Sequence, residues 1–172
     1  GIVAHADLAI GDPLGEVLDA HQAAAGGLFT GIRDALSSAL EPEVLAIPGG
    51  AEPGRFADEA FRDGVRELGR RGLTYDTWHY HHQNQDFAEL ARAVPDTVMI
   101  HDHFGGPMGT GIYAGRADEI FATWRHDIAE LARCENVVAK LGGLAMPDNG
   151  FGWDPAARPA TSDEVVGAQA RW

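Results

Sequence analysis

The hydrophobic positions along the chain follow two periods, one typical of strands and one typical of helices. Short apolar runs rich in β-branched and aromatic residues predict strands. Longer stretches with apolar residues three and four positions apart predict amphipathic helices. The predicted strands cover residues 1–8, 28–36, 73–83, 97–105 and 136–146. The predicted helices cover residues 12–27, 55–72, 84–96, 115–135 and 162–172.

Capping residues mark the ends of several of these helices. Asp12 followed by Pro13 predicts an N-cap and a first helical position. Gly26 predicts the end of the same helix, because glycine readily adopts the left-handed conformation that closes helices. Ser162 predicts the N-cap of the last helix.

Strands that alternate with amphipathic helices predict an α/β fold with a parallel sheet and helical crossovers. Two architectures fit this order, an open doubly wound sheet and a (β/α)8 barrel. The first strand is followed by "HADLAIGDPLG", which lacks the glycine fingerprint of nucleotide-binding open sheets, and "GGPMGTG" (105–111) does not match it either. Polar residues gather at the predicted carboxyl ends of several strands, which favours a TIM barrel. Five strands are too few for eight, so we expect a partial barrel.

Charge and cysteine content limit the classes of partner. The net charge is -13, from 26 acidic and 13 basic residues, which argues against nucleic acid and against anionic membranes. No apolar run approaches the roughly 18 residues of a membrane span. The single cysteine, Cys134, fits a reducing compartment, so we predict a cytoplasmic protein. The expected partner is a small-molecule substrate, and the open edges of a partial barrel also predict a possible homo-oligomer.

Four blocks of the sequence carry a family resemblance. They are "FTGIRDAL" from Phe29, the run from Phe61 to Pro107 that contains "TYDTWHYHHQ" and "MIHDHFGGP", "NVVAKLGGLAMPDNGFGW" from Asn136, and "TSDEVVGAQARW" from Thr161. In order and spacing they resemble the amidohydrolase-related, metal-dependent TIM-barrel hydrolases, in the branch that includes lactonases. The resemblance implies a hydrolase of this barrel type.

The resemblance also predicts which part of a barrel this chain forms. Family members carry a His-x-His pair at the end of barrel strand one and an aspartate at the end of strand eight. The matching blocks place this chain at barrel strands three to seven. We therefore expect residues 1–172 to form a single partial barrel domain, as a piece of a longer enzyme or as a natural truncation.

Two histidines stand at the end of the fourth predicted strand. His103, in "DHFGGP", resembles the family's histidine at the end of strand six, so we predict that it acts in catalysis or binds a metal. Relatives usually have an apolar residue at the position of His101, which predicts a hydrogen-bonded core histidine there. Strand alternation predicts that Asp102, between them, points toward the helix layer.

Other candidates lie at neighbouring strand ends. His81 and Gln83 lie nearest the end of the third strand, so we predict His81 as a catalytic residue and metal ligand and Gln83 as a substrate-binding residue. Arg33 matches a family arginine near the substrate, so we predict it as a catalytic residue, although a salt bridge explains it equally well. Relatives often have histidine after this arginine, where this chain has Asp34.

The last candidates follow the fifth strand. Lys140, the only lysine, lies in an apolar strand and matches a family lysine, which predicts either a substrate-orienting role or a buried ion pair. Trp153, on the long loop that follows, is predicted either to form a wall of the pocket or to pack. The resemblance implies a divalent metal, Zn or Mn, in an intact family member. We expect none in this chain, because the first-strand histidine pair is not part of it.

These residues predict hydrolysis of a lactone or a similar carbonyl compound. Two alternatives remain open at this point. One is an aromatic-carboxylate decarboxylase on the same fold. The other is a catalytically incomplete barrel fragment that serves as a binding or assembly module.

Overall fold

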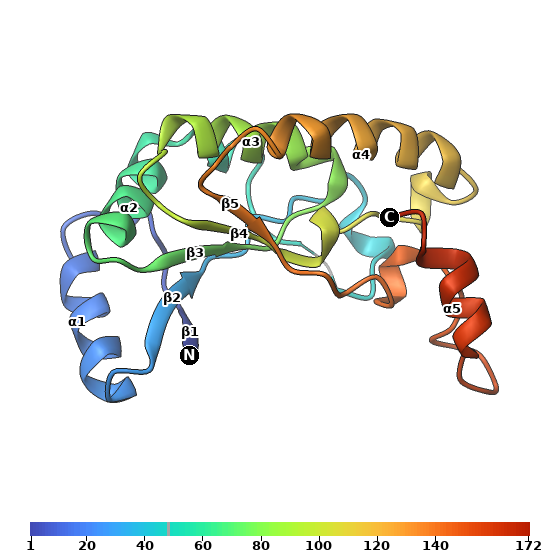
Figure 1. Ribbon diagram of the computed structural model, residues 1–172, viewed down its shortest axis with the longest axis horizontal. Coiled ribbons are helices and arrows are strands. Elements are labelled where there is room, and N and C mark those ends of the chain that lie inside the picture. The colour runs from blue at the N-terminus through green and yellow to red at the C-terminus, as the bar shows by residue number, and fades with distance from the viewer. Residues whose placement is uncertain (48) are drawn as a thin grey trace.

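Five parallel strands form one sheet in chain order (Figure 1). The structure is a computed structural model that describes residues 1–47 and 49–172. The strands are β1 (Ile2–His5), β2 (Phe29–Arg33), β3 (Thr74–Thr77), β4 (Met99–His101) and β5 (Val137–Ala139). Each strand pairs with the next one along the chain, in the order β1-β2-β3-β4-β5. The predicted α/β fold with parallel strands and helical crossovers is confirmed.

Helices cover one face of this sheet. They are α1 (Leu14–Ala25), α2 (Glu59–Arg70), α3 (Asn84–Ala93) and α4 (Ala117–Leu131), each of which connects two consecutive strands. Figure 1 shows α2, α3 and α4 along one side of the sheet. The core lies between these helices and the strands and includes the fully buried Phe61, Tyr75, Phe87 and Met99. A final helix, α5 (Ser162–Gln169), follows β5 and lies apart from the others.

The opposite face of the sheet has no covering layer within the described residues. Val3, Val98 and Val138 lie on this face and are 40%, 47% and 53% exposed. Parallel register places Val3 beside Gly31, and Gly31 beside Thr74. Residues aligned in this way share one face of the sheet, and every second residue of each strand belongs to it. We call it the uncovered face, and the candidate site lies on it.

The strands are shorter than their apolar patterns predict. The pairing of Thr77 with His101, and of His101 with Ala139, is the last in its ladder. Beyond it, residues His81–Gln83 form a 3-10 turn rather than the end of the predicted strand 73–83. His81 and Gln83 therefore do not belong to the third strand, because they have helical rather than extended backbone.

Two helix starts differ from the sequence prediction. Pro13 itself occupies the N-cap position of α1, so that Asp12 lies outside the helix. The N-cap of α5 is Thr161 rather than Ser162, because the Thr161 hydroxyl accepts a hydrogen bond from the Glu164 amide and the Glu164 side chain binds back to Thr161. Gly26 closes α1 in the left-handed conformation, as predicted.

Candidate functional site

Four charged side chains from four adjacent strands meet at the carboxyl ends of the sheet. Arg33 ends β2, Asp76 lies near the end of β3, and Asp102 and Lys140 directly follow β4 and β5. Arg33 and Asp76 are register partners, and Asp102 and Lys140 lie two residues beyond a second pair of register partners, Ile100 and Val138. All four therefore belong to the uncovered face. We call them the ionic cluster.

Each acid of the ionic cluster contacts both bases. Arg33 Nη2 lies 2.5 Å from Asp102 Oδ2 and 3.6 Å from Asp76 Oδ2. Lys140 Nζ lies 3.1 Å from Asp102 Oδ1 and also forms an ion pair with Asp76. Neither carboxylate oxygen of Asp102 has a well-aligned hydrogen bond among the described residues, so the two cations provide its compensation. The cluster is neutral as a whole, with two positive and two negative groups.

The two acids of the ionic cluster are buried, and the two bases are partly exposed. The Asp76 and Asp102 side chains are 1% and 0% exposed, whereas Arg33 and Lys140 are 39% and 48% exposed. A buried carboxylate without a partner is strongly disfavoured, so the acids require these cations. Partial desolvation lowers the pKa of Lys140, but contacts with Asp76 and Asp102 outweigh it and raise that pKa overall. The result is two fixed cations directed toward open space.

The ionic cluster corrects one prediction and contains one residue that the sequence analysis missed. Asp102 does not point toward the helix layer. It is His101 that does so, where its ring stacks on Phe87 of α3 at 5.7 Å. Asp102 is next along the strand and so faces the opposite way. Asp76 was missed, although an acidic residue inside the aromatic run "LTYDTW" is a signal that a buried partner is needed.

His103 lies just beyond β4 in an unusual conformation. Its φ angle is 54° and that of Phe104 is 57°, which places two consecutive non-glycine residues in the left-handed region. This backbone is uncommon and costs energy for residues with a Cβ atom. The half-buried His103 ring lies against the backbone of Gly143, in the loop after β5. His103 is therefore placed at the same end of the sheet as the ionic cluster.

His101 is a core histidine, as predicted. It is 2% exposed, and its Nε2 donates to Asn84 Oδ1 at 3.3 Å. His79 Nε2 donates to the same oxygen at 2.9 Å, while His79 Nδ1 accepts from the Thr77 hydroxyl. An amide oxygen only accepts, so both Nε2 atoms carry hydrogen. Burial lowers the pKa of His79 to about 3 and that of His101 to about 4.

His81 belongs to a second group of rings. It is 5% exposed, its Nδ1 accepts from the Met108 amide, and its ring packs edge-on against Tyr113 at 4.9 Å. Burial, with the nearby His82, lowers the pKa of His81 to about 4. His81 is therefore neutral at pH 7. Its predicted catalytic and metal-binding roles stay predictions.

The amide of Gln83 holds backbone in place. Its Oε1 accepts from the Ser38 and Tyr80 amides, and its Nε2 donates to the Leu36 carbonyl. Gln83 thus ties the turn after β3 to the loop after β2. This describes a structural role, and the predicted substrate contact stays a prediction.

Trp153 lies on the long loop between β5 and α5. Trp153 stacks on Phe151 with ring centroids 4.8 Å apart and lines a cavity of about 400 Å³ among loops 109–114 and 145–155.

Asp34 accepts a hydrogen bond from the Leu8 amide at 2.9 Å, and burial raises the pKa of Asp34. It therefore ties the segment after β1 to the end of β2.

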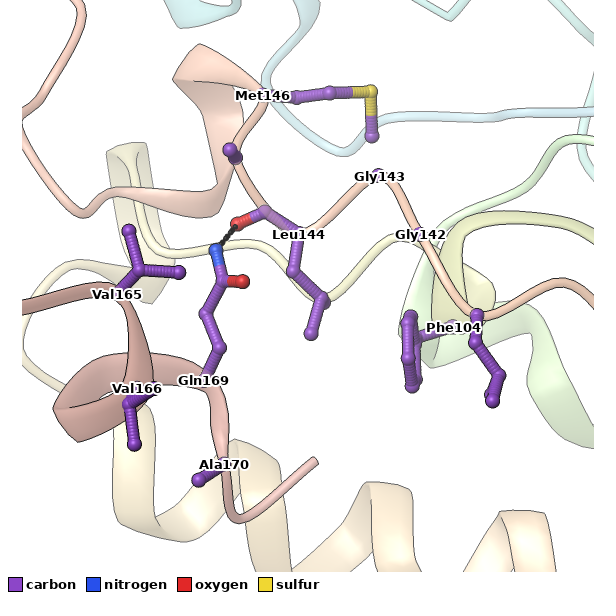
Figure 2. Close-up of a pocket in the computed structure, with 11 residues that line it drawn as sticks. Phe104, Gly142, Gly143, Leu144, Met146, Val165, Val166, Gln169 and Ala170 are labelled. Carbon is purple, nitrogen blue, oxygen red and sulfur yellow. Dashed lines mark hydrogen bonds between the residues drawn. The ribbon is translucent and has the colours of Figure 1, made fainter. Parts of the chain in front are cut away.

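An apolar cavity of about 580 Å³ lies beside this end of the sheet (Figure 2). It is bounded by Phe104, by the loop 141–146 after β5, and by α5. Gln169 of α5 donates from Nε2 to the Leu144 carbonyl at 2.8 Å, which holds the helix against the loop. Figure 2 shows Phe104 across the cavity from Val166 and Gln169 of α5.

The described residues do not form a metal site by themselves. No group of three or more His, Cys, Asp or Glu side chains within residues 1–47 and 49–172 is arranged to hold an ion. The two acids of the ionic cluster are already engaged with Arg33 and Lys140. A divalent metal at His103 and His81 stays a prediction for a complete barrel.

Parallel strands in chain order, helices on one face and charged groups at the carboxyl ends define the α/β class of the TIM-barrel proteins, here with five strands. The amidohydrolase family model matches residues 1–168. The chain therefore belongs to the amidohydrolase family.

Similar proteins include a sequence relative and a solved structure in two crystal forms. Uncharacterized protein y4mH of Sinorhizobium fredii is 33% identical over 175 residues, which cover 96% of this chain and 51% of that protein. An amidohydrolase from Burkholderia multivorans with bound HEPES superposes with a TM-score of 0.71 at 23% identity, over 96% of this chain and 50% of its own. The zinc-bound form of the same protein superposes with a TM-score of 0.72 at 22% identity, over 99% of this chain and 51% of its own. The chain thus spans about half the length of these relatives.

No helix in the described part of the chain is both long enough and apolar enough to cross a membrane.

Proposed function

We propose that this protein is a hydrolase that opens a lactone or a similar carbonyl compound at the carboxyl ends of its strands. The observation that carries the proposal is the ionic cluster. Two buried carboxylates hold Arg33 and Lys140 so that both cations face the uncovered side of the sheet. Membership of the amidohydrolase family supports hydrolysis as the reaction type.

The proposed reaction is attack of water on the substrate carbonyl. The new bond joins the water oxygen to the carbonyl carbon, and the bond from that carbon to the ring oxygen breaks. Negative charge develops on the carbonyl oxygen, where Arg33 and Lys140 stabilise it without reorganising, because Asp76 and Asp102 already fix them. His103 takes a proton from the water and returns it to the leaving ring oxygen. The product is a hydroxy acid.

The remaining predicted residues take supporting roles in this proposal. His81, neutral at pH 7, is the second imidazole for proton transfer. Gln83 and Lys140 hold the substrate near the strand ends, and the ring of Trp153 forms a wall of its pocket. The stack of Trp153 on Phe151 supports this role, because it fixes a flat apolar surface beside a cavity.

A panel of lactones tests the proposal on protein expressed from the complete open reading frame that encodes this chain. Hydrolysis is followed by release of acid. His103→Ala is expected to lower kcat by about 10²- to 10⁴-fold, the usual contribution of a general acid or base. His126→Ala, at an exposed position of α4, is the matched control and should keep full activity. Turnover that is undiminished in His103→Ala would remove His103 from the mechanism.

One observation also favours decarboxylation of an aromatic carboxylate as a second candidate. A pair of fixed cations suits a substrate carboxylate as well as it suits a developing oxyanion. The same panel should therefore include aromatic carboxylates, with carbon dioxide release as the measurement. Release of carbon dioxide without any lactone hydrolysis would replace the first candidate by the second.

A further inference from the structure

A short left-handed turn follows β4 and carries His103. Four consecutive residues, 103–106, have positive φ angles of 54°, 57°, 66° and 50°. The last two are glycines, for which this conformation is easy, but His103 and Phe104 carry side chains. Such a conformation is unfavourable for a residue with a Cβ atom and persists only where the surroundings impose it. The structure must therefore contain groups that hold this turn.

Trp124 of α4 holds the turn from the helix layer. Its indole Nε1 donates to the Phe104 carbonyl at 2.7 Å, and the Trp124 residue is 6% exposed. The ring itself is fixed by edge-on packing against Trp172, with centroids 5.0 Å apart. Within the turn, the Gly106 amide donates to the His103 carbonyl at 2.9 Å. Trp124 thus binds the strained peptide directly.

Gly143 limits the position of the His103 ring from the loop after β5. A Cβ atom at Gly143 would lie 2.3 Å from His103 Nδ1 and 2.6 Å from its Cγ. These distances are well inside van der Waals contact, so the imidazole occupies the space that a side chain would need. Gly143 has a φ angle of 88°, which also favours glycine. The adjacent Gly142 has no such restriction, because a Cβ atom there would meet nothing within 4 Å.

The His103 ring is not fixed by hydrogen bonds. His79, His81 and His82 each use ring nitrogens to contact a named partner. The described residues, 1–47 and 49–172, offer the His103 ring no equivalent bond. Backbone conformation and the contact with Gly143 therefore determine where the imidazole lies, and its nitrogens stay available.

We propose that Gly143 and Trp124 are positioning residues for His103. Trp124 holds the left-handed peptide that turns the His103 side chain away from the direction that strand alternation would give it. Gly143 provides the flat surface against which the imidazole rests. The inference rests on the proposed function only in that His103 is taken as the group that acts on substrate. Displacement of a reacting group by about 1 Å costs roughly 10²-fold in rate.

Three glycine variants test the contribution of Gly143. Gly143→Ala introduces both the contact with His103 and an unfavourable φ. Gly72→Ala introduces only the unfavourable φ, because position 72 has a φ angle of 69° with open space around it and precedes β3, at the opposite end of the sheet from His103. Gly142→Ala introduces neither. The readouts are the His103 ring signal in a ¹H–¹³C NMR spectrum, assigned by its loss in His103→Gln, and kcat on the best substrate.

We expect the His103 signal to move in Gly143→Ala alone, with kcat lowered by about 10- to 100-fold. Folding of each variant is checked by circular dichroism. An unmoved ring signal and unchanged kcat in folded Gly143→Ala would overturn the role of Gly143. A signal that moves equally in Gly72→Ala would overturn it as well.

Trp124→Phe provides a test that does not depend on Gly143. Phenylalanine keeps an aromatic ring in the packing with Trp172 but removes the N–H donor. Trp78→Phe is the matched control, because Trp78 Nε1 is buried and has no hydrogen-bond partner within the described part of the chain. Trp124→Phe should weaken the strong intraresidue amide–Hα NOE of Phe104 that positive φ produces, and shift the His103 signal. Identical spectra of the two variants around residues 103–106 would overturn the role of Trp124.

The NMR readout separates this inference from the proposed function. If no lactone or carboxylate is turned over, the ring signal still reports whether Gly143 and Trp124 position His103. If they do, and His103→Ala retains full activity, the proposed role of His103 fails while the positioning stands.

Discussion

Charged residues on the uncovered face are paired so that the buried ones are negative and the exposed ones positive. Asp76 and Asp102 are essentially inaccessible, yet each lies within contact of Arg33 and Lys140. The Asp34 carboxylate, in contrast, is compensated by a backbone amide. Removal of one member of a buried pair is more damaging than replacement of both. The ionic cluster therefore behaves as one unit in any mutational analysis.

The two histidines that bind Asn84 predict that stability falls in mild acid. The folded pKa of His101 is lowered to about 4 from an ordinary value of 6.5. As pH falls from 6.5 toward 4, this histidine becomes protonated in the unfolded chain but stays neutral in the folded protein. The free energy of unfolding therefore decreases. For each such histidine the slope is about 1.4 kcal/mol per pH unit.

His101→Phe removes one of these groups and keeps a ring against Phe87. We expect its free energy of unfolding, measured by urea titration at several pH values, to fall less steeply by about 1.4 kcal/mol per pH unit between pH 6.5 and 4. His126→Gln, at an exposed site, should leave the slope unchanged. Equal slopes in His101→Phe and the unaltered protein would show that His101 is not the group responsible.

At the scale of elements, the helices α2 and α5 begin where a side chain satisfies a free backbone amide, of Ala60 in α2 and of Glu164 in α5. The capping box of Thr161 and Glu164 begins α5, and Arg158 adds an ion pair to Glu164 at 2.7 Å. Helix α5 is short, and none of its residues is buried. Capping therefore contributes a larger share of the stability of α5 than of α2, because α2 has four buried residues that pack in the core.

Substitution of the two neighbouring candidates for the α5 cap distinguishes between them. Thr161→Ala is expected to cost about 1 kcal/mol of local helix stability, because the Glu164 amide loses its acceptor. Ser162→Ala should cost little, since Ser162 is already inside the helix. Amide hydrogen exchange over residues 163–169 measures both effects. Faster exchange in Ser162→Ala than in Thr161→Ala would contradict the structural assignment.

At the scale of the whole molecule, the arrangement of layers is asymmetric. One face of the sheet packs against four helices, and the other exposes Val98 and Val138 together with the cations of the ionic cluster. The edge strands β1 and β5 each have one strand neighbour within the described residues. Exposed apolar sheet surface and open edges favour association.

We therefore expect residues 1–172, expressed alone, to self-associate in a concentration-dependent way. Analytical ultracentrifugation should show dimers or larger species, and Val138→Lys should shift the distribution toward monomer. Ala122→Lys, at an exposed position of α4 on the helix side, is the matched control and should not shift it. A monomer at all concentrations would contradict the expectation.

The sequence by itself determined the order of strands and helices, the parallel sheet and the family. These depend on local periodicity and on long blocks of residues, which a single chain displays directly. It also singled out His103, Arg33 and Lys140, because each lies near a predicted strand end in a block that resembles the family.

Only the tertiary structure decided where the strands stop and which way the side chains after them face. The prediction for Asp102 was wrong because it placed His101 on the face away from the helices, whereas packing turns the His101 ring toward Phe87 of α3. The partnership of Asp76 with Lys140 joins residues 64 positions apart, and the contact of His103 with Gly143 joins two different loops. Such contacts arise from the packing of distant segments, which local sequence patterns do not specify.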